Sequence, residues 1–338
     1  MSKLPVTLLL IFIYSFSSAQ IKEENDPSFH HTVSNWFSAW ELVYKEIYGL
    51  NDIEDVDFVL FDTHYVYSTS EISIAEGDFV HGADLLNLSL KWKKKAHHGV
   101  LTFPDGSSAP VGMMCFAAPN SINNKPYFVM PLTSFWNEQK IKSAPLALED
   151  LVTGVFLHEF SHTQQMENFG RWISEFVDTN KMGDDFDDNF IQNTFQKDSV
   201  FVRLYNQEID FFYGAISTKK NVDVEKVNMG LEYMKARRNL FFVDKFENLF
   251  EVEDHFLTME GFGQYNMYLW LTHKKGGNID KNTAVEGVRR NKRVWSQDQG
   301  FLLFLILEEF TDPVSWAKYM FGSDLIYIYD LLKQKIIE

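Results

Sequence analysis

The chain has very little cysteine and little positive charge, and it has no apolar run long enough to cross a membrane. Cys115 is the only cysteine, so no intramolecular disulfide can form. Against 47 Asp and Glu residues there are 31 Lys and Arg residues, which gives a formal net charge of −16. This balance argues against nucleic acid or an anionic membrane as a partner. The apolar run from Phe301 to Leu307 is too short to span a bilayer, so we expect a buried core helix there and no stable membrane insertion.

The first 19 residues have the pattern of a secretory signal peptide. A short basic start precedes an apolar stretch, and Ser17-Ser18-Ala19 forms a small-residue cleavage site. We expect cleavage after about Ala19 and a secreted or periplasmic mature chain, with a retained N-terminal anchor as the alternative. The full sequence has 45% hydrophobic and 16% aromatic residues, so we expect the mature chain to rely on its core for stability.

The order of the predicted elements indicates an α+β fold, with strands first and helices after them. We expect an α/β part over about residues 20–145 and a helical part over about 146–338, which together form one domain. The acidic run 184–189 lacks the glycine and terminal glutamate of a calcium loop, so we interpret it as a solvated loop. The N-terminal elements that we expect are a helix opened by Pro27, strands at 58–61 and 65–67, a helix over 84–97 with the basic cluster 91–95 near its end, a strand pair at 100–103 and 111–116, and a strand at 127–130.

Residues 158–162 read His-Glu-Phe-Ser-His, a complete HExxH motif. On a helix, His158 and His162 share one face and can bind one metal ion together. Glu159 projects beside them, where it can act as a general base toward a metal-activated water. This residue pattern indicates a zinc hydrolase, most often a peptidase.

The surrounding sequence predicts a helix over about 146–168 that contains the motif. Pro145 suits the first helical position, acidic residues follow in the first turn, and Gly170 suits the end. Gly154 lies one turn before His158 on the metal face. We expect its missing side chain to leave room above the metal.

A catalytic zinc ion needs a third protein ligand and keeps one position for water. The next candidates along the chain are Glu175, Glu208, His255 and Glu260. Glu175 follows the motif too closely for the chain to turn back. Glu208 and Glu260 both lie on convincing helices, and Glu260 is surrounded by apolar and aromatic residues, where a buried carboxylate needs a partner. We favour Glu260, with Glu208 as the alternative.

The segments HEFSHTQQ and MEGFGQY resemble the gluzincin group of zinc peptidases, and more narrowly some uncharacterised bacterial zinc-dependent peptidases. In the latter, HExxHxxQ is followed by a Glu-Gly-x-Ala-x-Tyr-like segment, and Gly263 replaces that alanine here. The resemblance implies a zincin-like fold, one Zn²⁺ per chain, His158, His162 and Glu260 as ligands, and Glu159 as the base.

The resemblance also has limits that bear on specificity. The Gly-x-Met-Glu-Asn segment of gluzincin aminopeptidases is missing, because Gly112-Met113-Met114-Cys115 contains no glutamate. The third-histidine extension of metzincins is missing too. An endopeptidase acting on peptides or proteins therefore fits better than an aminopeptidase.

Several roles around the predicted site stay open at the sequence level. An extended substrate could pair with the strand at 111–116 or the one at 127–130, and Gln264 could support a histidine. The oxyanion donor could be Tyr265, Tyr268, His255, Arg237 or Arg238. Two other readings remain: a metal-dependent amidase or esterase for a non-peptide substrate, and a non-enzymatic exported binding protein whose metal site His255 would close.

Overall fold

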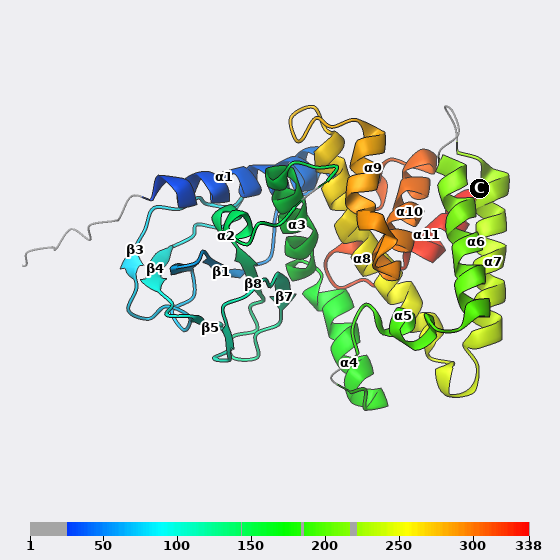
Figure 1. Cartoon of the computed structure of the whole chain (residues 1–338), viewed down its shortest axis with the longest axis horizontal. Coiled ribbons are helices and arrows are strands. Elements are labelled where there is room, and N and C mark those ends of the chain that lie inside the picture. The colour runs from blue at the N-terminus through cyan, green and yellow to red at the C-terminus, as the bar shows by residue number, and fades with distance from the viewer. Residues whose placement is uncertain (1–25, 143, 184–185, 217–221, 338) are drawn as a thin grey trace, which may run out of the picture.

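A computed structural model describes residues 26–142, 144–183, 186–216 and 222–337 of the chain. The predicted signal peptide lies outside these residues. The described part is a mixed α+β structure with a small sheet at one end and a helical half at the other (Figure 1). The predicted order, with strands first and helices after them, is therefore confirmed. Helix α3 lies between the sheet and the helical half (Figure 1).

The main sheet has six strands in the order β3-β4-β2-β1-β8-β7. Strands β1 and β8 are parallel, and the other neighbours are antiparallel. Strand β8 lies between β1 and β7, so both of its edges are occupied. Strand β7 pairs only with β8 among the described residues and forms an edge of the sheet. The strand bounds are β1 Asp57–Phe61, β2 Tyr65–Ser68, β3 Asp78–Phe79, β4 Lys93–Ala96, β7 Phe116–Ala118 and β8 Tyr127–Pro131.

The first helix, α1 (Pro27–Glu41), continues into a π-helical turn, Leu42–Ile47. Pro27 occupies the first turn, and the Asp26 side chain caps the helix by accepting a hydrogen bond from the Phe29 amide at 3.2 Å. The buried apolar side chains of α1 face the core, where Phe37 contacts Phe58 of β1 at a ring-centroid distance of 5.3 Å. The predicted helix at Pro27 is therefore confirmed.

The predicted helix over 84–97 is wrong, because Lys93–Ala96 forms strand β4. This strand pairs antiparallel with β2, and its lysines find acidic partners instead of a helix terminus. Lys93 contacts Glu71 at 2.6 Å and Lys94 contacts Asp26 at 2.8 Å. The basic cluster therefore neutralises nearby carboxylates along a sheet strand, a tertiary effect that local periodicity does not report.

The sequence predicted a strand pair at 100–103 and 111–116. The first strand is confirmed, but its partner begins earlier in the chain than predicted. Strand β5 (Val100–Thr102) pairs with β6 (Ser108–Pro110), and Gly106 lies in the turn with a φ of +83°. A φ of this sign favours glycine. Residues 111–115 leave this hairpin as a loop, and the chain then enters β7 at Phe116.

The helical half forms as predicted from residue 146 onward, and its longest helix is α8. The apolar stretch from Phe301 to Leu307 is fully enclosed in α10, as expected of a core helix. No helix in the described ranges is both long and apolar enough to cross a membrane. The helices are α2 Thr133–Glu138, α3 Leu148–Thr163, α4 Arg171–Asn180, α5 Phe190–Phe195, α6 Ser199–Ile216, α7 Val224–Phe241, α8 Leu249–Thr272, α9 Lys281–Arg289, α10 Trp295–Phe310 and α11 Ile328–Ile337.

Helix α8 packs against both α3 and α10, and glycines allow these close approaches. A Cβ atom on Gly261 would lie 2.4 Å from the backbone carbon of Gly300, so α8 and α10 touch through their backbones. On the side facing α3, a Cβ on Gly154 would lie 2.5 Å from the Met267 side chain. The space at Gly154 is therefore filled by Met267, and our expectation of room above the metal at this position is wrong.

Candidate metal centre

The HExxH motif lies in the last turns of α3, which is shorter than predicted. The helix covers Leu148–Thr163 instead of 146–168, and a π-helical turn, Met166–Gly170, follows it. Glu149 and Asp150 lie in the first turn, where acidic side chains complement the helix dipole. Nearly every side chain of the last three turns is buried between the sheet and α8. The motif is therefore held on a rigid, enclosed element.

Three side chains converge on one point between α3 and α8. The Nε2 atoms of His158 and His162 lie 3.2 Å apart. Glu260 of α8 places one carboxylate oxygen 3.1 Å from His158 Nε2 and the other 3.5 Å from His162 Nε2. Glu260 and His158 are both buried. Glu260 lies in the middle of the 24-residue α8, not at the start of a helix as the sequence suggested.

Glu159 lies beside this point without pairing with either ring. Its carboxylate and the ring nitrogens of His158 and His162 offer ligand atoms that all lie within 4.8 Å of one another. A buried His158–Glu159–His162 group could therefore hold a metal ion. Within the described chain, Glu159 forms no ion pair with either imidazole, whereas Glu260 contacts both.

Polar side chains next to the site orient the candidate ligands. The Nδ1 atom of His162 lies 2.9 Å from Gln165 Oε1, so this ring nitrogen donates and Nε2 keeps its lone pair. Gln297 of α10 donates to Glu260 Oε2 at 3.0 Å, and Gln264 donates to Gln297 at 2.7 Å. Gln264 thus supports Glu260 through Gln297, and our expectation that it supports a histidine is wrong.

The imidazole of His158 lies directly on the backbone of α8. A Cβ atom on Gly263 would lie 2.6 Å from His158 Nδ1, closer than side chains can approach. The glycine that replaces alanine in the resembling segment therefore makes the room that this histidine occupies. His158 Nδ1 is buried and has no hydrogen-bond partner in the described chain.

The electrostatics of the site favour neutral histidine and ionised Glu260. Burial lowers the pKa of His158. Burial alone would raise the pKa of Glu260, but the imidazoles of His162 and His158, with the Gln297 hydrogen bond, lower it to about 2. Burial raises the pKa of Glu159 well above its usual value, and the Glu260 charge adds to this effect. Metal ligands need neutral imidazole and ionised carboxylate, and the pKa values of His158 and Glu260 are shifted in those directions.

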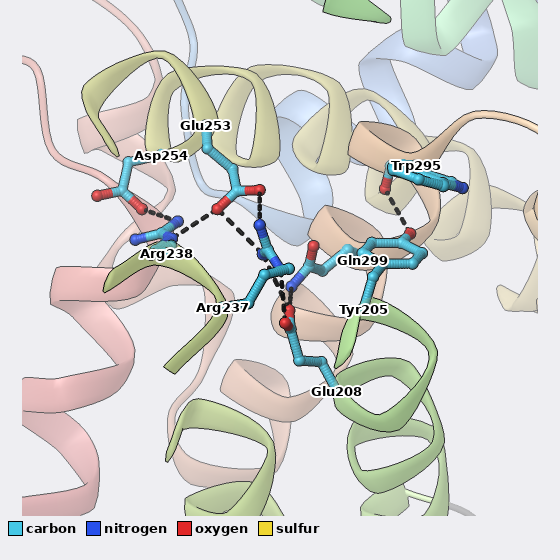
Figure 2. A network of polar contacts seen from close by, with 8 residues as sticks. All are labelled: Tyr205, Glu208, Arg237, Arg238, Glu253, Asp254, Trp295 and Gln299. Carbon is cyan, nitrogen blue, oxygen red and sulfur yellow. Dashed lines mark hydrogen bonds and ion pairs between the residues drawn. The ribbon is translucent and has the colours of Figure 1, made fainter. Parts of the chain in front are cut away.

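Glu208, the alternative third ligand, belongs to a separate network of buried charges (Figure 2). Arg237 donates to both oxygens of Glu208, at 2.6 and 3.0 Å, and also to Glu253 at 2.8 Å. Arg238 donates to Glu253 and, at 2.6 Å, to Asp254. The carboxylate of Glu208 is thus fully engaged by a guanidinium. Arg237 and Arg238 are engaged as well, so neither is available as an oxyanion donor.

The other candidates named from sequence also lie in packed surroundings. His255 is fully buried and stacks on Trp172 at a ring-centroid distance of 4.2 Å. Its ring nitrogens have no partner in the described chain, and it is not in the candidate metal group. Tyr265 stacks on Phe304, and Tyr268 is buried against Phe301. Glu175 is exposed on α4.

Three residues near Glu159 were not found by sequence reasoning. Arg290 follows α9 with a left-handed φ of 44°, and its charge lowers the pKa of Glu159. Burial and the Glu159 charge raise the pKa of Cys115. Burial, Glu260 and Asp187 raise the pKa of Asp188 to about 8, so Asp188 itself is not simply a solvated loop residue. None of the three belongs to a local motif, since chain folding alone brings them to α3.

The strand geometry decides between the two proposed substrate strands. Residues 127–130 belong to β8, which is already paired on both sides. Residues 111–115 form a loop, but Phe116 begins β7, whose outer edge has no partner in the described part of the chain. Strand β7 also packs against α3. Of the two strands proposed from sequence, only the one that enters β7 therefore leaves an edge to which an extended peptide could add.

We also compared the chain with known proteins. No family model matches it, and neither a curated protein nor a solved structure does.

Replacing Gly263 by alanine should weaken metal binding. The new Cβ would push the His158 ring from its place, and we expect zinc affinity to fall on the order of 10- to 100-fold. Competition with a chromophoric chelator measures this affinity. Gly214→Ala is the matched control, because its Cβ on α6 would meet only the Lys226 side chain, at 3.5 Å. Equal affinity in the Gly263→Ala variant and the wild type would contradict the assignment.

His255 should make the fold sensitive to acid. Burial lowers the pKa of His255 to about 3 in the folded chain, whereas an unfolded histidine titrates near 6.5. The unfolded state therefore binds the extra proton below about pH 6.5, and the folded state loses stability as the pH falls. Between pH 7 and pH 5 this contribution amounts to about 2 kcal/mol.

The measurement is urea unfolding of the wild type and His255→Phe at both pH values. The variant should lose about 2 kcal/mol less stability between pH 7 and pH 5 than the wild type does. His31→Phe, which removes an exposed imidazole, should keep the wild-type loss. An unchanged loss in His255→Phe would show that this ring does not stay neutral when buried.

Proposed function

We propose that this chain is a zinc-dependent metallohydrolase of the gluzincin type, and specifically a peptidase that cleaves internal bonds. The supporting observation is the triangle formed by His158, His162 and Glu260. Around a tetrahedral zinc with ligands at 2.0–2.1 Å, neighbouring ligand atoms lie about 3.3 Å apart. The two ring nitrogens lie 3.2 Å apart, and the two oxygens of Glu260 lie one against each ring, Oε2 at 3.1 Å from His158 Nε2 and Oε1 at 3.5 Å from His162 Nε2. The donor set, two imidazoles and one carboxylate, is also one that zinc accepts.

Residues outside the triangle support a catalytic site over a structural one. A structural zinc site is closed by a fourth protein ligand, whereas a catalytic site keeps one position for water. His255, the residue that would close the site, is instead stacked on Trp172 at a ring-centroid distance of 4.2 Å. Glu159 stands beside the triangle without pairing with the rings, which suits a base that acts through a water.

In this proposal the bound zinc supplies a Lewis acid that lowers the pKa of a water and polarises the scissile carbonyl. Glu159 takes up the proton of the attacking water and passes it to the leaving nitrogen. Gln165 holds the His162 ring in the tautomer that points Nε2 at the centre. Gln297 holds the Glu260 carboxylate toward both rings.

The sheet edge supports a peptide as the substrate. Strand β7 packs against the motif helix and offers an unpaired edge within the described chain. An extended peptide would add there as a further strand. The charge of Glu159 helps raise the pKa of Cys115, which lies immediately before β7. A sheet edge beside a motif helix, with the third ligand on a later helix, suits a zincin-like fold. Because residues 1–19 have the pattern of a secretory signal peptide, we also propose that the protein is exported.

Glu159→Gln should keep zinc and lose hydrolysis. The amide retains the shape of the side chain but cannot accept the proton, and we expect kcat to fall on the order of 10²- to 10⁴-fold. Cleavage of a quenched peptide mixture, with mass spectrometry of the products, measures the loss. Glu149→Gln, in the first turn of the same helix, is the control and should keep full activity. Equal activity in the Glu159→Gln and wild-type proteins would eliminate this mechanism.

Metal content distinguishes Glu260 from Glu208. We expect about one zinc per wild-type chain after dialysis, measured by plasma mass spectrometry. Glu260→Gln should lose most of the metal because a ligand is removed. Glu208→Gln should keep the metal but unfold at lower urea, since it leaves Arg237 with fewer countercharges in the core. Zinc that is retained by Glu260→Gln and lost from Glu208→Gln would reverse the ligand assignment.

A further inference from the structure

A cavity of about 280 Å³ lies beside α3, outside the candidate metal centre. Its apolar wall is formed by Trp136 of α2, by Leu146, and by Leu151 and Val155 of α3. The Trp136 indole is fixed by a 3.1 Å hydrogen bond to the carbonyl of Pro131. The volume is close to the lower end of ordinary ligand pockets and suits a single side chain.

Three cations surround this apolar wall: Lys142, Arg290 and Arg293. Their cationic groups form no ion pair or hydrogen bond with another residue that the structure describes, although the Arg293 main-chain carbonyl accepts a hydrogen bond from Gln192 at 3.0 Å. The neighbouring Arg289 behaves differently, because it donates twice to the buried Asp298, at 2.5 and 3.1 Å. Arg289 therefore anchors the end of α9 to α10, while Arg290 extends from that fixed point toward the cavity.

The close packing of α9 also fixes this point. A Cβ atom on Gly287 would lie 2.5 Å from the Leu146 side chain, so α9 approaches the cavity wall as closely as a glycine allows. Gly287 precedes Arg290 by three residues, about one helical turn. The cation is thus carried by a rigid helix end, not by a free loop.

The cavity lies next to the proposed base. Val155 and Glu159 are four residues apart on α3 and share one helix face. Arg290 lowers the pKa of Glu159, and the Glu159 and Glu260 charges act back on Arg290. The Arg290 side chain reaches solvent but is densely surrounded by protein, as expected at the mouth of a cavity.

We propose that this cavity, which we call the basic pocket, binds a carboxylate of the substrate and gives the enzyme a preference for acidic peptides. The inference rests on the proposed peptidase function and names its substrate class. Two guanidinium groups and one ammonium group around an apolar wall match a carboxylate at the end of a short apolar stem. The carboxylate belongs to a Glu or Asp side chain or to the C-terminus of the peptide.

A cleavage experiment with matched peptides tests the pocket. One series carries Glu or Gln at each position around a common scissile bond and ends in an amide. A second pair ends in a free acid or an amide. We expect kcat/KM to be about tenfold higher for the acidic member at one position only. A preference in the first series identifies a side chain, and one in the second pair identifies the C-terminus.

Variants tie the preference to the basic pocket. Arg290→Gln should reduce the acidic preference in kcat/KM to less than about twofold. Arg293→Gln should have a smaller effect and reduce the logarithm of that preference by about half. Lys333→Gln, which removes a positive charge on α11 instead, should retain it. Equal rates for acidic and neutral peptides at every position would overturn the proposal, as would a preference that survives both arginine variants.

A binding measurement separates this proposal from the peptidase function. Zinc-loaded Glu159→Gln protein is titrated calorimetrically with the same acidic and neutral peptides. Tighter binding of the acidic member that is lost in Arg290→Gln supports the basic pocket even where the wild type cleaves nothing, and then only the peptidase function fails. Cleavage without any acidic preference leaves the peptidase function intact and removes the basic pocket. Equal binding of both peptides, without cleavage, overturns both.

Discussion

The contact between His158 and the backbone of α8 at Gly263 determines the rest of the site. Because no side chain separates the two, α8 lies close enough for Glu260 to reach both imidazoles. One turn before His158 on α3, Met267 of α8 fills the space at Gly154, so the two helices are also in close contact there. On its other side α8 touches α10 through Gly261 and Gly300, which places Gln297 against Glu260. One helix thus organises both the proposed ligands and their support.

This arrangement brings together carboxylates whose negative charges repel one another unless a strong cation is bound between them. Burial raises the pKa values of Glu159 and Asp188, and the nearby charge of Glu260 raises both further. Arg290 offsets the effect only in part, from the mouth of the basic pocket. Perturbed groups of this kind concentrate at functional sites. A divalent cation between the rings would relieve the repulsion that the fold otherwise tolerates, and fold stability would then be linked to metal occupancy.

The sequence predicted the local parts of this structure and missed those that depend on distant segments. His158, Glu159 and His162 follow from helical spacing, and Glu260 follows from its apolar neighbours. Lysines 93–95 were misread because their acidic partners are remote in sequence. Arg290 and Asp188 carry no local signal, since each affects the pKa of Glu159 only through the tertiary fold. Helix and strand types were therefore mostly recoverable, whereas the electrostatic surroundings of the base were not.

The buried network in Figure 2 has a consequence for how the helical half comes apart. Arg237 of α7 is shared between Glu208 of α6 and Glu253 of α8, and Gln299 of α10 also donates to Glu208. Detaching α7 alone would leave the carboxylates of Glu208 and Glu253 in the core without the countercharge of Arg237. This would cost several kcal/mol of free energy. The four helices should therefore open as a single cooperative unit. Proteolytic nicking would then find no partly open state in which the remaining three helices stay closed.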